Sequence, residues 1–139
     1  MNKIISLLPA LLFSAALAAC SFSADTKKIE QEVQHFHDLL DAGKSAAIYA
    51  AASDEFKKAS TQEDFVALLD AVHRKLGDFK STSQKGWNVN YNTSGKFVTI
   101  TYETVYAEGK AAEQFVYRVS DEEALLVGYH VSSNVLILK

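Results

Sequence analysis

The stretch that decides the fold is residues 87–106, WNVNYNTSGKFVTITYETVY, in which two runs flank the turn residues Asn92-Thr93-Ser94-Gly95. Every second residue of the first run is apolar or aromatic: Trp87, Val89 and Tyr91. The second run is rich in β-branched and aromatic residues, which are enriched in strands. A period of two that is interrupted by turn residues predicts a β-hairpin with one buried face.

The strand pattern continues after this hairpin. We expect a two-residue turn at Glu108-Gly109, a third strand over about residues 112–120, an acidic turn at residues 121–123 and a fourth strand over about residues 125–138. Consecutive hairpins predict an antiparallel meander of four strands. The pattern leaves open whether residues 79–84 begin the first strand or only lead into it.

Pairing Tyr91 with Lys96 across the first turn sorts the side chains onto two faces, because opposed residues point to the same side. The face that we expect the helices to cover carries Trp87, Val89, Tyr91, Val98, Ile100, Tyr102, Tyr106, Phe115, Tyr117, Val119, Leu125, Val127, Tyr129 and Val131. The opposite, open face carries Asn88, Asn90, Phe97, Thr99, Thr101, Glu103, Gln114, Val116, Arg118, Leu126 and His130. We therefore expect no Asp, Glu or His on the covered face.

The chain before Gly77 has a helical period. A first helix is expected over residues 25–42, with Asp25 as its cap and the apolar positions Ile29, Val33, Phe36 and Leu40 on one face. A second, short helix is expected over residues 45–52, followed by a tight turn at residues 53–56 that inserts Phe56 into the core.

We expect a third helix to begin at a capping box made by Ser60 and Glu63 and to end before Gly77. The positions that we expect it to bury are Phe65, Leu68, Leu69, Val72 and Leu76. Helices followed by an antiparallel meander predict an α+β domain in which the helices pack on the curved sheet.

This order of elements resembles the cone-shaped fold of the nuclear transport factor 2-like, or cystatin-like, superfamily. The residues that carry the resemblance are Leu39-Leu40-Asp41-Ala42-Gly43-Lys44, Ser53-Asp54-Glu55-Phe56, Gln62-Glu63-Asp64-Phe65 and the aromatic strands after them. Within the superfamily, residues 25–139 look most like small bacterial lipoproteins whose domain has no assigned function. The resemblance implies a possible dimer interface, because many members of the superfamily dimerise through the open sheet face. It also implies that the enzymes of the superfamily, such as steroid isomerases and dehydratases, hold carboxylates or a histidine inside the cone.

The N-terminal residues have the pattern of a leader: Lys3, an apolar run over residues 4–17, and then Leu17-Ala18-Ala19-Cys20. The last four residues resemble the bacterial lipobox, which implies cleavage before Cys20 and lipidation of its thiol. We expect a signal peptide over residues 1–19, a lipidated tether over residues 20–24 and the domain over residues 25–139. The alternatives are an ordinary signal peptide or a membrane span. A span needs about 20 apolar residues, and the leader has fewer than that before Cys20.

The resemblance to lipoproteins predicts the bacterial cell envelope as the location and the membrane as a partner through Cys20. Ser21 follows the cysteine, where the usual inner-membrane retention signal is an aspartate, so the outer membrane is favoured. Nucleic acid is a poor partner because 17 acidic residues outnumber 14 basic ones. The single cysteine leaves no disulfide to form.

Two groups of residues are candidate sites. The first is a ligand pocket in the cone, lined by Trp87, Tyr91, Tyr102, Tyr106, Tyr117 and Tyr129. Converging hydroxyls in an apolar cavity suit a small amphipathic ligand, and the alternative is that these rings fill the core. The second is an interface on the open face, made by Phe97, Thr99, Val116 and Leu126, where the alternative is scattered surface hydrophobics.

No catalytic, metal or cofactor site is predicted. His35 and His37 point to nearly opposite sides of a helix, and His73 lies on a different helix, so no cluster with zinc-like spacing is expected. We therefore expect a non-catalytic, lipid-anchored domain that binds a small amphipathic ligand or a protein partner. The alternatives are a dimerisation module that acts through the open face and an isomerase-like or dehydratase-like enzyme. A buried carboxylate or histidine in a real cavity would favour the enzyme.

Overall fold

The computed structural model describes residues 16–138, with side chains from residue 24 onward. The helices that precede the sheet are α1 (Ala16–Asp41), α2 (Ser45–Ala51), α3 (Asp54–Ala59) and α4 (Gln62–Leu76). The strands are β1 (Phe79–Asn92), β2 (Gly95–Tyr106), β3 (Gly109–Val119) and β4 (Ala124–Ser132), followed by α5 (Asn134–Leu138). The strands form one four-stranded antiparallel sheet in the order β1-β2-β3-β4. The α+β class and the meander are confirmed.

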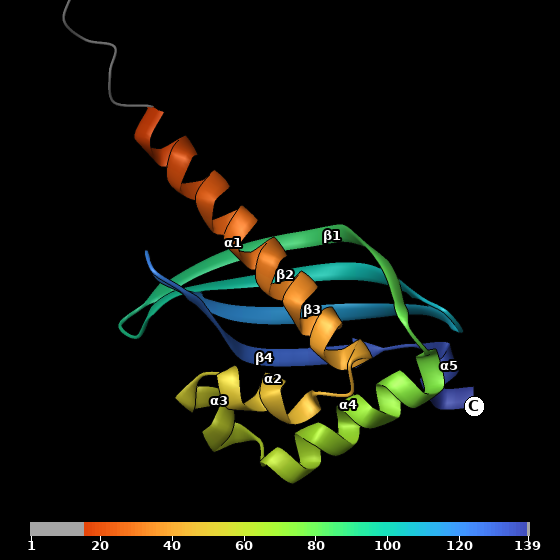
Figure 1. Ribbon diagram of the computed structural model, residues 1–139. Helices are drawn as coiled ribbons and strands as arrows, with labels where there is room; N and C mark the ends of the chain where they lie inside the picture. The colour runs from red at the N-terminus through yellow and green to blue at the C-terminus, as the bar shows by residue number, and fades with distance from the viewer. Residues whose placement is uncertain (1–15, 139) are drawn as a thin grey trace, which may run out of the picture.

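The sheet is curved, and α1 runs diagonally along it while α2, α3 and α4 lie beyond β4 (Figure 1). The core lies between the helices and the inner face of the sheet, where Phe36 of α1 and Phe115 of β3 meet edge to face at 5.1 Å between ring centroids. The apolar period of α1 is confirmed, because Ile29, Val33, Phe36 and Leu40 are all buried.

The first hairpin has the expected register, with Tyr91 opposite Lys96. The second turn differs, because Tyr106 pairs with Gly109 and the two turn residues are Ala107 and Glu108. This moves β3 by two residues relative to the expected pairing, so each side chain keeps its face. β1 begins at Phe79, which answers the question that the sequence left open.

The pairing of β4 differs more from the pairing that the sequence predicts. A bulge lies opposite the step from Val116 to Tyr117, so that Leu126 pairs with Tyr117 and is buried. Because an extra residue exchanges the two faces, Leu126 lies on the inner face and Leu125, opposite Arg118, does not. The expected places of Leu125 and Leu126 are therefore wrong. The strand also ends at Ser132, and the residues after it form α5 instead of extending the sheet.

The helix boundaries also differ in detail. Residues 53–56 do not form an isolated turn: Ser53 caps α3 by accepting a hydrogen bond from the Phe56 amide, and Phe56 is buried as expected. Thr61, not Ser60, caps α4 by accepting from the Asp64 amide. Leu68 is 41% exposed and is not part of the core. Gly77 ends α4 with a positive φ of 74°, which favours glycine.

The start of α1 differs from the expected short tether. The helix begins at Ala16, so residues 20–24 are helical in the structure and Asp25 does not cap it. Asp25 instead forms an ion pair with Lys96 of β2, and Lys28 donates to the carbonyl oxygens of Ser120 and Asp121 at 2.6 and 3.0 Å. These contacts hold α1 against the strand turns. Over residues 16–138, no helix combines the length and apolar character needed to cross a membrane.

Candidate functional site

The centre of the site is Glu113 of β3, whose side chain is fully buried on the inner face of the sheet. It lies opposite Tyr102 of β2, and the alternation of β3 places it on the same face as Phe115 and Tyr117. The prediction that no acidic residue faces the interior is therefore wrong. The alternation itself contained the signal, because Glu113 lies two residues before Phe115.

Four side chains donate hydrogen bonds to the Glu113 carboxylate, and we call this group the Glu113 cluster. Its members besides Glu113 are His37, Thr104, Tyr106 and Tyr129. Oε2 accepts from His37 Nε2 at 2.8 Å and from Thr104 Oγ1 at 2.5 Å. Oε1 accepts from the hydroxyls of Tyr106 at 2.8 Å and Tyr129 at 2.6 Å. The cluster therefore joins α1, β2, β3 and β4 through one carboxylate.

Burial raises the pKa of Glu113, but the hydrogen bonds from His37, Thr104 and Tyr129 and the charge of His37 outweigh burial, so its pKa lies below the usual value. The same surroundings act in the opposite direction on the tyrosines. Burial and then the Glu113 charge raise the pKa of Tyr106 and of Tyr129 well above the usual value. Glu113 is thus a carboxylate, and the two phenols are protonated donors.

His37 of α1 is the second residue that the sequence analysis missed. Its side chain is fully buried, and its ring stacks on Phe79 at 4.2 Å between centroids. His37 lies four residues after Val33 and three before Leu40, so the apolar period of the helix placed it on the buried face. His35 is exposed, as the expected divergence of the two histidines requires.

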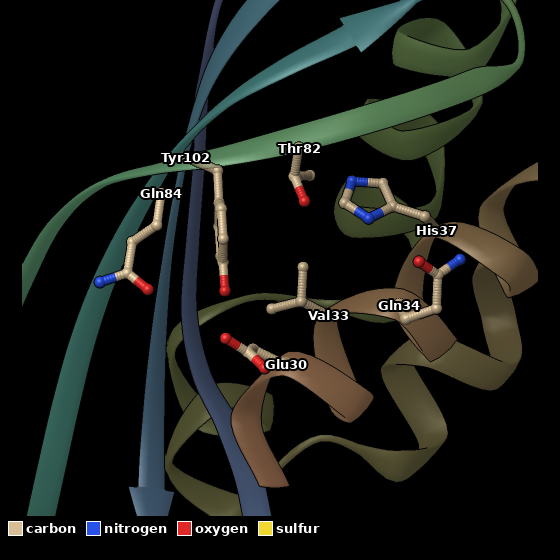
Figure 2. A pocket seen from close by; sticks show the side chains of 7 residues that line it. All are labelled: Glu30, Val33, Gln34, His37, Thr82, Gln84 and Tyr102. Atoms are coloured by element: carbon tan, nitrogen blue, oxygen red, sulfur yellow. The ribbon is translucent and has the colours of Figure 1, made fainter. Parts of the chain in front are cut away.

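Beside the cluster, a cavity of about 280 Å³ lies between α1, β1 and β2, and we call it the α1–β1–β2 pocket. Its lining residues are Glu30, Val33, Gln34, His37, Thr82, Gln84 and Tyr102. Figure 2 shows Glu30, Val33 and His37 projecting from α1 toward Thr82, Gln84 and Tyr102 of the sheet. The lining is mostly polar, unlike the aromatic interior next to it.

Two residues that line this pocket each have a buried polar atom without a hydrogen-bond partner among the described residues: His37 Nδ1 and the Tyr102 hydroxyl. Tyr102 is 5% exposed, and burial, followed by the charge of Glu30, raises its pKa to about 12. Buried polar groups in proteins nearly always have a partner, so each exception asks for an explanation. A ligand or water molecule in the pocket that forms hydrogen bonds with these atoms would be a direct explanation.

The predicted cone pocket is not built as expected. Tyr106 and Tyr129 point their hydroxyls to Glu113, while Tyr117 is buried and Trp87 is partly buried against the core. Tyr91 is 70% exposed and lies outside any interior site, so its assignment to a pocket is wrong. Tyr102 alone among the predicted residues lines the pocket. The interior that the tyrosines were expected to leave open is filled by the rings of Phe36, Phe65, Phe115 and Tyr129.

The predicted interface residues separate into two groups. Thr99 lies opposite Val116, and Phe97 lies opposite Arg118, all on the outer face and all partly exposed. Leu126 belongs to the core, because the bulge in β4 turns it inward. The candidate interface is therefore reduced to Phe97, Thr99 and Val116.

A third group of polar residues lies at the end of α1. Asp41, His73 and Asp78 offer ligand atoms within 4.8 Å of one another, although the sequence spacing predicted no such cluster. His73 Nε2 lies 3.2 Å from Asp78 Oδ1 and 3.7 Å from Asp41 Oδ1. Asp41 also accepts from the backbone amide of Phe79. These contacts account for the group as a polar network that fixes the start of β1.

The chain is similar to one protein family and to solved structures. One such structure is from Catenulispora acidiphila, with a TM-score of 0.52, 15% identity, and coverage of 81% of this chain and 93% of that chain. At this identity the likeness shows the fold alone. No curated protein matches the chain. Residues 32–129 match the family described as "Protein of unknown function (DUF4019)". Because this match spans more than half of the chain, the protein belongs to the DUF4019 family.

Proposed function

We propose that this protein is a binding domain whose α1–β1–β2 pocket holds a small polar molecule. The observation that carries the proposal is the pair of unpartnered, buried polar atoms at the pocket, His37 Nδ1 and the Tyr102 hydroxyl. Leaving a buried donor or acceptor unpaired costs about 1–3 kcal/mol. A bound molecule that pairs with both atoms would recover that free energy.

The size and place of the pocket support a small ligand. The cavity of about 280 Å³ is just below the range of roughly 300–1,000 Å³ that is usual for ligand sites. Rings of Phe36, Phe115 and Tyr129 pack against one another in the interior beside it. The proposal therefore replaces the amphipathic ligand expected in the cone with a polar one at its edge.

Native mass spectrometry of the protein, purified as the cell produces it, tests this proposal. We expect a mass increment that disappears on denaturation. Tyr102→Phe removes the unpartnered hydroxyl and should reduce the increment, whereas Tyr91→Phe makes the same chemical change at a site that is 70% exposed and should keep it. A bare mass for the unaltered protein, together with no added small molecule that binds the pocket, would overturn the proposal.

A second candidate function is acid–base catalysis, as in the isomerase-like or dehydratase-like alternative. It is favoured by the His37–Glu113 pair, in which the carboxylate fixes Nε2 at 2.8 Å and leaves Nδ1 at the pocket. A general base must reach the proton that it removes and must lack a proton itself. The nitrogen-15 spectrum of the His37 ring tests this requirement. A proton on Nδ1 at neutral pH would exclude the role of a base.

We also propose the nuclear transport factor 2-like fold and a lipid anchor for this domain. The fold proposal is supported by helices that pack on a curved four-stranded antiparallel sheet. The anchor proposal is supported by Leu17-Ala18-Ala19-Cys20, and it places the protein in the bacterial envelope. Incorporation of a labelled fatty acid into the protein, and its loss in Cys20→Ser, would support the anchor. Equal labelling of both would contradict it.

A further inference from the structure

We infer that the α1–β1–β2 pocket selects a small organic cation that also carries a hydroxyl group, such as an amino alcohol. This inference rests on the proposed ligand-binding function and adds a chemical class to it. Three features of the pocket carry the inference: its charge, its polar groups that need a partner and its depth.

The first feature is charge. Among the described residues, Glu30 is the only acidic one that lines the pocket, and no Lys or Arg lines it. Figure 2 shows the Glu30 carboxylate directed toward the Tyr102 hydroxyl across the pocket. The influence of Glu30 on the pKa of Tyr102 agrees with this proximity. The Glu30 charge would repel an anionic group placed beside it and would attract an ammonium group there.

The second feature is the set of polar groups that need a partner. The Glu113 carboxylate only accepts, so His37 donates through Nε2–H, and His37 Nδ1 has no partner among the described residues. Nδ1 accepts in the neutral ring and donates in the protonated ring, and a hydroxyl group can pair with either form. The Glu30 carboxylate only accepts, so it pairs with a donor such as an ammonium group. A ligand with an ammonium group and a hydroxyl group therefore suits both residues.

The third feature is depth. Glu30 is exposed, while His37 is fully buried, so the two residues lie at different depths of the pocket. The apolar side chain of Val33 lies between them along α1 and lines the same pocket. A short aliphatic chain against Val33 would place an ammonium group at Glu30 and direct a hydroxyl group toward the buried end of the pocket, where His37 lies. Amino alcohols have this pattern of polar ends and an apolar middle.

Three matched probes test the inference: ethanolamine, ethylene glycol and glycolate, which differ in charge but little in size. Binding is followed by the amide signals of Gln34, Thr82 and Gln84 in nuclear magnetic resonance spectra of the purified protein. We expect ethanolamine to bind about fivefold more tightly than ethylene glycol at low salt, as for a favourable, partly exposed ion pair. Glycolate should bind most weakly, and added salt should reduce the difference.

Two variants on the same helix complete the experiment. Glu30→Gln removes the charge with little change of shape and should abolish the preference for ethanolamine over ethylene glycol. Glu32→Gln makes the same change at a residue that does not line the pocket and should keep the preference. Ethylene glycol or glycolate binding as tightly as ethanolamine would overturn the cation inference and leave the binding proposal standing. If no probe shifts these signals and the purified protein also has a bare mass, the binding proposal falls as well.

Discussion

The Glu113 cluster and the α1–β1–β2 pocket share the side chain of His37 but use it differently. On the cluster side, Nε2 donates to a carboxylate that accepts three further hydrogen bonds. On the pocket side, Nδ1 has no partner among the described residues. The same contrast separates two tyrosines, since the Tyr129 hydroxyl donates to Glu113 and the Tyr102 hydroxyl has no partner in the described part of the chain. The polar groups of the cluster are paired with one another, whereas two of those in the pocket are unpaired.

Replacing Glu113 should have the largest effect, because it breaks the cluster at its only acceptor. In Glu113→Leu, His37 and the three hydroxyls lose their partner while they stay buried. Removing one partner of a buried charged pair costs about 3–5 kcal/mol, so the free energy of unfolding in urea should fall by that amount. Glu103→Gln is the control, since Glu103 has a largely exposed ion pair with Lys110 and should change stability by less than about 0.5 kcal/mol.

A smaller loss for Glu113→Leu than for Glu103→Gln would contradict the role of the cluster. Removing a carboxylate from the pocket should, in contrast, leave the free energy of unfolding nearly unchanged. Glu30→Gln changes an exposed residue that has no part in the cluster, so its free energy of unfolding should stay near that of the unaltered protein.

The pH dependence of stability gives a second test of the cluster. The pKa of Glu113 in the folded protein lies below its usual value of 4.5. The folded state therefore binds this proton less readily than the unfolded chain does. The contribution of Glu113 to stability is fully present above about pH 4.5 and is lost as the pH falls through the lower pKa of the folded state. The stability difference between the protein and Glu113→Gln should shrink in that acidic range, as measured by urea unfolding. A stability difference that stays constant over this acidic range would contradict the lowered pKa of Glu113 in the folded protein.

Much of the fold could be predicted from the sequence, because period and turn residues are local signals. The helical period of Ile29, Val33, Phe36 and Leu40 and the alternation around Trp87 gave the layers and the first hairpin. The bulge opposite Val116 is marked in the sequence only by Gly128, because an isolated glycine in a strand indicates a bulge without showing which residue is the extra one. The sequence analysis did not use this signal, and one extra residue was enough to exchange Leu125 and Leu126 between the faces.

The candidate site was harder to predict for a different reason. Glu113 and His37 both lie at positions that the period assigns to the interior, but they are charged or polar types that are rarely buried. Each is tolerated because the other is its partner, and they are far apart in the sequence. The same separation hid the group of Asp41, His73 and Asp78. Local patterns can place such residues on a face, but only the packed structure shows which of them meet.

Two tyrosine substitutions test the contrast between the Glu113 cluster and the α1–β1–β2 pocket, with smaller expected changes in stability. Tyr129→Phe removes a hydrogen bond to a charged group, which costs about 1.5–3 kcal/mol. Tyr102→Phe removes a hydroxyl without a partner and should leave the free energy of unfolding unchanged or slightly raised. Urea unfolding without added ligand measures both. Equal losses would mean that the Tyr102 hydroxyl has a partner and that the pocket is not held open for a ligand.

The smallest effect on stability is expected on the outer face of the sheet, which belongs to neither region. Val116 lies opposite Thr99 and Gly128, and a Cβ atom added to Gly128 would lie 3.4 Å from Val116 Cγ2. In Val116→Lys, the aliphatic part of lysine can cover the same space while its ammonium group reaches water, so the fold should be intact. If this face joins two copies of the chain, the variant should be monomeric in sedimentation experiments because the charge would be buried at the contact. An unchanged assembly state would remove the outer face from consideration as an interface.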